Sequence, residues 1–281
     1  MEGHSRRGLS GLFVCVALAA TSARASVGPA EQSGVFALLG GTPRVVSKFW
    51  AEHRGGLTAT LNVRQFQPDG KTPILNYDVD MQKLMHIVVV RDDFATFDHL
   101  HPAFDAASGT FSQPFTKVPN HRYYLYADST PRGIGQQVFR FTIESDGPIA
   151  KLTLPATPSA AITAAGPYAV ALERTTLEAN RAQALRITIL ENGAPARDLT
   201  PYLGAAAHVV FINVSSLAYV HVHPAVIGTA PMATEGMTMN GRAGPLLQAE
   251  LPPLPAGTYK AWIQFRGRDE LYTAAFTLQA R

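Results

Sequence analysis

The chain has 281 residues, of which 46% are hydrophobic and 16% charged, and its formal net charge at pH 7 is +3. Three arginines and one glutamate fall in the first 25 residues, which leaves a net charge of +1 for the rest of the chain. No cluster of lysine and arginine interleaved with aromatic residues accompanies this small charge, so nucleic-acid binding is not expected. The length allows one or two domains.

Residues 1–25 are typical of an export signal. Two arginines precede an apolar stretch from Leu9 to Ala20, and a small-x-small cleavage motif ends at Ala25. The apolar run is too short to span a membrane, and no membrane span is expected in the mature chain. The only cysteine, Cys15, lies inside this run. We therefore expect a bacterial periplasmic or secreted protein that folds without disulfides.

The sequence pattern becomes regular only after residue 50. Residues 26–50 show no clear period and are expected to form a leader of uncertain structure, with a short helix near residues 47–50. From Leu57 to Val63 apolar and polar residues alternate, which predicts a half-buried antiparallel strand. Pro68-Asp69-Gly70 predicts a turn, because glycine adopts positive φ without strain.

The first histidine-rich stretch occupies residues 84–102. His86 begins a β-branched run, and His99 and His101 lie in an alternating segment that ends at a proline, so the stretch predicts a β-hairpin. The polar turn between the two segments places His86 opposite His101 and Val88 opposite His99. Opposed residues of a hairpin share a face, and so do residues two apart on one strand. The three imidazoles are therefore expected to project from one side.

Further short strands are expected at residues 111–118, 122–128 and 136–144. About seven short strands without a long helical period predict a β-sandwich domain over residues 51–146. Residues 147–166 are rich in proline, alanine, threonine and serine and are expected to form a linker. A second β-sandwich domain is expected over residues 167–281.

The second domain repeats the histidine pattern of the first. His208, His221 and His223 correspond to the first three histidines, and 13 positions separate the first histidine from the second in both copies. Over 17 aligned positions five residues are identical, and four of these are the three histidines and the following proline. A repeat that has diverged elsewhere but keeps its imidazoles in register indicates that the histidines act together.

The ends of the two domains also correspond. Tyr123 and Tyr259 each follow a proline-containing turn, and this pattern resembles the tyrosine corner of immunoglobulin-like sandwiches. The second domain has about 14 additional residues after its His-x-His-Pro motif, and they contain Met232, Met237 and Met239. Met237 and Met239 are possible additional ligands, because thioethers suit Cu(I). The alternative is that these methionines only pack the loop against the sandwich.

Two interpretations of the histidines remain open. Neutral imidazole is a common ligand of zinc and copper, and three imidazoles on one face would leave an open coordination position. The predicted ligands are His86, His99 and His101 in one site and His208, His221 and His223 in the other. Alternatively, the histidines tie the hairpins to neighbouring backbone carbonyls, since buried polar groups need partners. No catalytic motif is present, so enzymatic activity is not expected.

The upstream histidine with the His-x-His-Pro motif resembles exported bacterial proteins built from tandem cupredoxin- or immunoglobulin-like sandwiches, a group that includes YtkA-like and copper-associated envelope proteins. The resemblance covers residues 57–145 and 167–281 and implies an all-β fold and copper handling. The chain lacks the cysteine ligand of blue-copper electron carriers. We therefore expect sequestration or delivery of one ion per domain, copper before zinc, with another envelope protein as a further partner. The alternative is a metal-free envelope interaction module.

Overall fold

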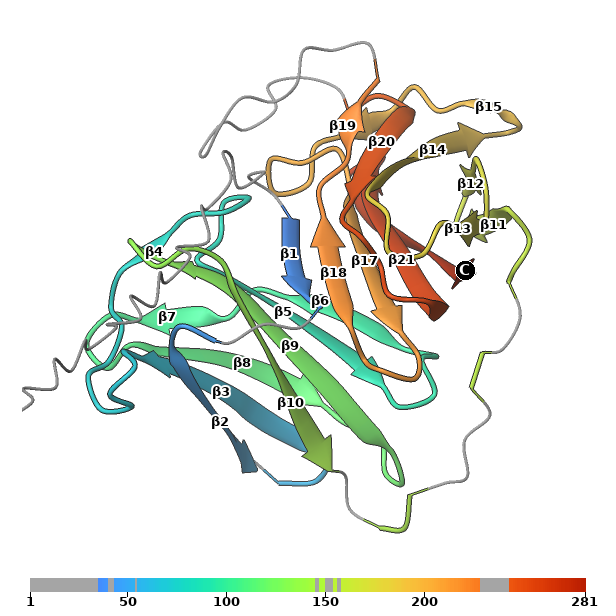
Figure 1. Cartoon of the computed structure of the whole chain (residues 1–281). Helices are drawn as coiled ribbons and strands as arrows, with labels where there is room; N and C mark the ends of the chain where they lie inside the picture. The colour runs from blue at the N-terminus through green and yellow to red at the C-terminus, as the bar shows by residue number, and fades with distance from the viewer. Residues whose placement is uncertain are drawn as a thin grey trace, which may run out of the picture. The chain divides into compact units, whose positions relative to one another are not determined.

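The structure is a computed structural model, and it describes residues 35–39, 43–53, 55–144, 147–149, 154–155, 158–227 and 243–281. Every helix or strand assigned within these ranges is a β-strand (Figure 1). The described ranges therefore contain no helix that could cross a membrane. The expectation of an all-β sandwich fold is confirmed. The predicted export signal at residues 1–25 lies outside the described residues.

Two sheets form from strands within residues 46–144, which are called the first half of the chain below. A four-stranded sheet contains, in order, β2 (Val46–His53), β3 (Thr58–Phe66), β8 (Thr110–Thr116) and β7 (Ala103–Asp105). A five-stranded sheet contains, in order, β10 (Gln137–Glu144), β9 (Arg122–Pro131), β5 (Met85–Arg91) and β6 (Phe97–Leu100), with β4 (Tyr77–Asp78) paired to β9.

Two further sheets form mainly from strands within residues 162–280, which are called the second half of the chain below. A seven-stranded sheet contains, in order, β1 (Val35–Leu38), β18 (Tyr219–Val222), β17 (His208–Asn213), β21 (Gly257–Gly267), β22 (Glu270–Ala280) and β13 (Thr176–Leu177), with β16 (Leu199–Thr200) paired to β21. A six-stranded sheet contains, in order, β11 (Ile162–Ala165), β12 (Tyr168–Leu172), β14 (Gln183–Glu191), β20 (Leu246–Leu251) and β19 (Ala225–Val226), with β15 (Ala194–Pro195) paired to β14.

Each pair of sheets encloses a hydrophobic core. In the first half, Leu61 of β3 and Phe111 of β8 pack in one cluster with Leu125 of β9. In the second half, Ile187 of β14 and Phe211 of β17 belong to a second cluster. The side chains of each cluster come from both sheets of the pair, as expected for a β-sandwich.

A third core lies where the five-stranded sheet of the first half meets the seven-stranded sheet of the second. It contains Val88 of β5, Tyr126 of β9, Val210 of β17 and Trp262 of β21. Since side chains alternate along a strand, Val88 and Val90 face this third core while the intervening Val89 faces the first sandwich core. Strands β5 and β17 are thus buried on both faces, which explains their uninterrupted apolar runs.

The short helix expected near residues 47–50 is wrong. These residues belong to β2, which pairs with β3 along its whole length. Phe49 and Ala51 pack against the first sandwich core, whereas Trp50 between them is 37% exposed. That alternation has the period of a strand, and a short apolar run alone does not distinguish the two structures.

Two other boundaries differ from expectation. Strand β1 lies within the leader expected at residues 26–50 and pairs with β18 of the second half (Figure 1). Strand β11 lies within the linker expected at residues 147–166 and pairs with β12. It begins with the β-branched residues Ile162 and Thr163, which favour strands. Residues 32–281 form one compact unit by their contacts, and the division into two domains stays a prediction.

The local features that anchor the sandwiches are as expected. The Val118 N–H donates to the Tyr123 hydroxyl at 2.7 Å, and the Tyr259 hydroxyl donates to the Pro255 carbonyl at 2.8 Å. Both tyrosines therefore tie a turn to the strand that follows it, which confirms the expected tyrosine corners.

Candidate metal centre

The predicted hairpins form with the predicted register. Val88 of β5 pairs with His99 of β6, and Val210 of β17 pairs with His221 of β18. In both copies, then, the first histidine of the His-x-His motif projects from the same side of the sheet as the valine opposite it. Because those valines belong to the third core, the histidine faces of the two hairpins are turned toward each other.

All six histidines lie in one cluster. Within the halves, ring centroids are 5.2 Å apart for His86 and His99 and 4.6 Å apart for His221 and His223. Between the halves the separations are as small, at 5.0 Å for His99 and His208 and 5.5 Å for His86 and His221. The repeat predicted two groups of three; it did not indicate that the fold would join them.

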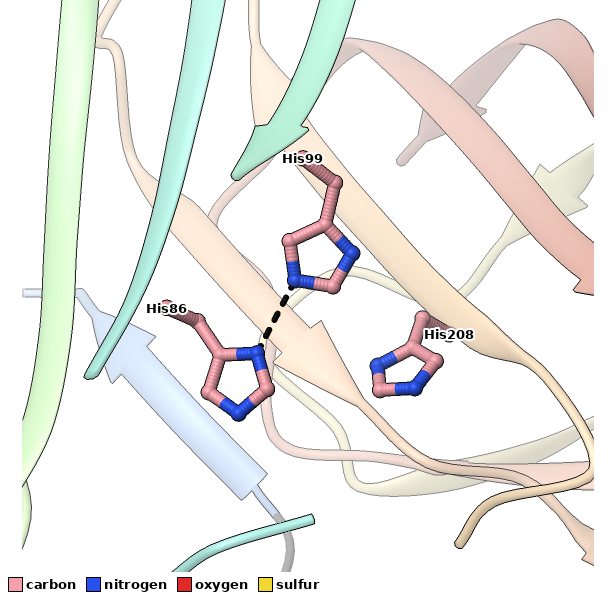
Figure 2. Close-up of side chains that lie close together, drawn as sticks. All are labelled: His86, His99 and His208. Carbon is pink, nitrogen blue, oxygen red and sulfur yellow. Dashed lines mark hydrogen bonds between the residues drawn. The ribbon is translucent and has the colours of Figure 1, made fainter. Parts of the chain in front are cut away.

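Two sets of three histidines in the described part of the chain have ligand atoms within 4.8 Å of one another and could hold a metal ion. One set is His86, His99 and His208, so it combines both halves (Figure 2). The other is His208, His221 and His223, which matches the predicted second trio. We refer to these as the mixed triad and the C-terminal triad.

His101 is the predicted histidine ligand that belongs to neither triad. Its ring centroid nevertheless lies 4.7 Å from that of His99, and its Nε2 is buried without a hydrogen-bond partner. His101 therefore borders the cluster. The predicted methionine ligands, Met237 and Met239, lie outside the described residues, as does Met232.

Backbone carbonyls fix the orientation of the first histidine of each half. His86 Nε2 lies 3.2 Å from the Asp80 carbonyl oxygen, and His208 Nε2 lies 3.1 Å from the Tyr202 carbonyl oxygen. A carbonyl oxygen can only accept, so Nε2 carries the proton in both rings. The lone pair of each neutral imidazole is consequently on Nδ1, which points into the cluster.

Side chains from the opposite half orient the next pair of histidines. His99 Nδ1 lies 3.0 Å from Gln264 Oε1, and His221 Nδ1 lies 3.1 Å from Asp128 Oδ2. Gln264 also donates from Nε2 to Thr273 Oγ1 at 3.3 Å, which directs its Oε1 toward His99. With acceptors at Nδ1, both rings present Nε2 lone pairs to the cluster.

As a result, within each half a ring nitrogen with a lone pair points toward a second ring nitrogen that also has a lone pair. His86 Nδ1 lies 3.0 Å from His99 Nε2, and His208 Nδ1 lies 3.3 Å from His221 Nε2. Two nitrogens bound to one tetrahedral zinc ion at 2.0–2.1 Å are about 3.3–3.4 Å apart. A cation that accepts both lone pairs would therefore stabilise either pair.

Burial makes it unfavourable for a proton to be the cation between the two nitrogens. It lowers the pKa of His86, His208 and His221 well below the usual range for histidine. Burial also lowers the pKa of His101 to about 3, and proximity to His99 contributes in the same direction. The rings are therefore neutral near pH 7, the form that binds metal ions.

The most informative residues that sequence reasoning missed are Asp128 and Gln264. They lie in corresponding places: Asp128 pairs with His86 across β9 and β5, and Gln264 pairs with His208 across β21 and β17. Each follows its aligned tyrosine, Tyr123 or Tyr259, by five positions. A polar residue five positions after the aligned tyrosine in both strands was the available signal.

A family model described as Domain of unknown function (DUF8832) matches residues 162–281. The match begins at the first residue of β11, ends at the last residue of the chain and includes the C-terminal triad. No match to a curated protein was found. The geometry of the histidine cluster therefore carries the functional argument.

Proposed function

We propose that this protein is an exported metal-binding protein that sequesters or delivers a transition-metal ion, with copper preferred over zinc, through its histidine cluster. The observation that carries the proposal is the pair of nitrogen–nitrogen contacts at 3.0 and 3.3 Å, in which each ring directs its N–H outward to a protein acceptor. Histidine ligands of metals in proteins commonly have such outer acceptors, which fix the tautomer and orient the ring.

The ligand chemistry supports a late transition metal. A site built from neutral imidazoles suits copper and zinc, whereas magnesium and calcium prefer oxygen ligands. Among divalent ions of the first transition row, copper binds nitrogen ligands most tightly. The resemblance of the His-x-His-Pro hairpins to copper-associated envelope proteins favours the same metal, and residues 1–25 favour a periplasmic or secreted location.

The burial of the cluster supports storage or transfer. His86, His208 and His221 are each at most 1% exposed, and His101 and His223 are partly exposed. An ion would therefore enter past the partly exposed rings and lose contact with bulk water. Such burial suits the retention of an ion.

Titration with Cu²⁺ and Zn²⁺ tests the proposal. The protein purified without residues 1–25 should bind either metal stoichiometrically, and His208→Ala should abolish or strongly weaken binding because His208 belongs to both triads. His53→Ala is the matched control, since His53 is an exposed histidine in β2. Stoichiometry is measured by mass spectrometry of the metal content and affinity by isothermal calorimetry.

The absence of stoichiometric binding, or binding that His208→Ala leaves unchanged, would reject the proposal. The same measurements separate it from a metal-free envelope interaction module. In that case the cluster substitutions would lower the melting temperature, but added metal would not raise the melting temperature of the unmodified protein.

A further inference from the structure

His208 is common to the two triads. Its Nε2 donates to the Tyr202 carbonyl, so Nδ1 is the nitrogen that can bind an ion. A nitrogen lone pair serves one metal ion at a time. An ion in the C-terminal triad therefore takes a ligand from the mixed triad, and the reverse also holds.

The triads differ in the acceptor that orients their second histidine. In the mixed triad, His99 faces the amide oxygen of Gln264 at 3.0 Å. In the C-terminal triad, His221 faces the carboxyl oxygen of Asp128 at 3.1 Å. The two acceptors occupy corresponding positions of β21 and β9. The two triads therefore differ at this position, where one has an amide group and the other a carboxyl group.

Asp128 is itself held by a hydroxyl group of the second hairpin, whereas Gln264 is held by Thr273 of the neighbouring strand. The Tyr219 hydroxyl donates to Asp128 Oδ2 at 2.6 Å. The corresponding residue of the first hairpin is Phe97, which stands opposite Val90 as Tyr219 stands opposite Ile212. Phe97 has no hydroxyl group and stacks on Trp262 instead. The C-terminal triad thus has a fixed carboxyl group behind His221.

A carboxyl group behind an imidazole has two effects on a buried cation. It accepts a stronger hydrogen bond than an amide oxygen does, which makes the imidazole a better electron donor. In its ionised form it also places negative charge near a cation that has left water. Removal of such outer partners typically weakens metal binding 10- to 100-fold.

From this asymmetry we propose that the cluster holds one metal ion per chain, that the ion occupies the C-terminal triad, and that Asp128 is the positioning residue that selects this triad over the mixed one. The proposal rests on the metal-binding function proposed above. It assigns His86 and His99 to a weaker position that competes for His208.

Competition titration with Zn²⁺ against a chelating dye tests the proposal. The unmodified protein should bind one ion, and Asp128→Asn should bind it 10- to 100-fold more weakly. Asp128→Glu should recover part of the loss, since it restores the carboxyl group. With Co²⁺ as a probe, the visible absorption of the bound ion should differ between the unmodified protein and Asp128→Asn.

A matched pair of variants keeps the test decisive if Asp128→Asn does not fold. His223→Ala removes a ligand from the C-terminal triad alone and should weaken Zn²⁺ binding. The double variant His223→Ala with Gln264→Glu gives the mixed triad a carboxyl group behind His99, and its affinity should rise 10- to 100-fold above that of His223→Ala.

Two Zn²⁺ ions bound with similar affinity would overturn the proposal. Unchanged affinity in folded Asp128→Asn would also overturn it, as would the lack of any gain from Gln264→Glu in the His223→Ala background. In each of these outcomes the metal-binding function stands. If the unmodified protein binds no metal, the proposed function itself fails, so the two failures are distinguishable.

Discussion

Each histidine whose outer contact is defined uses its two ring nitrogens for different purposes. His86 donates from one nitrogen to a backbone carbonyl, and His221 directs one toward the carboxyl group of Asp128. The second nitrogen points to a neighbouring imidazole in both cases. The histidines are thus both structural and available as ligands, so the two interpretations left open by the sequence are not mutually exclusive.

The lowered histidine pKa values predict acid sensitivity of the metal-free protein. In the unfolded chain histidine gains a proton near pH 6.5, while buried His86, His208 and His221 resist protonation to much lower pH, and His101 to about pH 3. The unfolded state then binds more protons, so the free energy of unfolding should fall as pH drops below about 6.5. The slope is roughly 1.4 kcal/mol per pH unit for each histidine.

Urea unfolding at several pH values between 7 and 4 measures this dependence. His53→Ala should show the same dependence as the unmodified protein, because its side chain is exposed. A free energy of unfolding that does not change between pH 6.5 and 5 would contradict the prediction.

The β-branched run, the alternating segment and the polar turn between them were enough to predict the first hairpin and its register, including Val88 opposite His99, and the repeat extended the prediction to the second hairpin. These patterns were not enough to predict the mixed triad, because that set depends on how two sheets far apart in sequence pack against each other. Asp128 and Gln264 were missed for the same reason: each acts on a histidine of the other half.

At the scale of elements, β5 and β17 each separate two cores. Ile87 and Val89 face the first sandwich core, and Val88 and Val90 face the third. The uninterrupted apolar run in β5 indicated burial on both sides, a signal that the hairpin prediction did not use. Strand β2 was missed because Phe49, Trp50 and Ala51 are consecutive apolar residues, so the sequence does not show the alternation of a half-buried strand.

The third core should contribute strongly to stability. Trp262 is 3% exposed and stacks on Phe97 with ring centroids 5.0 Å apart. Trp262→Ala should therefore lower the free energy of unfolding by about 3–5 kcal/mol, as large-to-small substitutions of buried aromatic residues do. Urea unfolding followed by circular dichroism measures the change.

Trp50→Ala is the matched control, since Trp50 is the other tryptophan of the chain and is 37% exposed. It should change the free energy of unfolding by no more than about 0.5 kcal/mol. Equal effects of the two substitutions would show that the third core is not a major source of stability.

At the scale of the whole described unit, each half contacts the other through residues at equivalent positions. Tyr126 stacks on Tyr219 with ring centroids 4.5 Å apart, and Phe97 stacks on Trp262 in the corresponding arrangement. The Tyr126 hydroxyl donates to the Leu217 carbonyl at 3.1 Å. The repeat in the sequence therefore corresponds to two halves that bury matching faces against each other.

Because a residue of each half orients a histidine of the other, neither half alone should bind a metal ion as tightly as the intact chain does. Residues 162–281 contain the C-terminal triad but not Asp128, so their affinity for Zn²⁺ should be at least 10-fold lower. Mixing them with residues 32–161 should restore affinity. Calorimetric titration of each fragment and of the mixture measures this. Full affinity of residues 162–281 alone would contradict the prediction.

The pairing of β1 with β18 has a consequence for the order in which the molecule can assemble. Val35 pairs with Val222, so this contact closes a loop that includes most of the chain. The entropy of loop closure opposes such a contact before it stabilises the fold, and contacts between residues far apart in sequence form slowly. During synthesis from the N-terminus, β1 cannot form this pairing until β18 has also been made. Because β18 also carries His221, maturation of the cluster requires synthesis of the chain at least through β18.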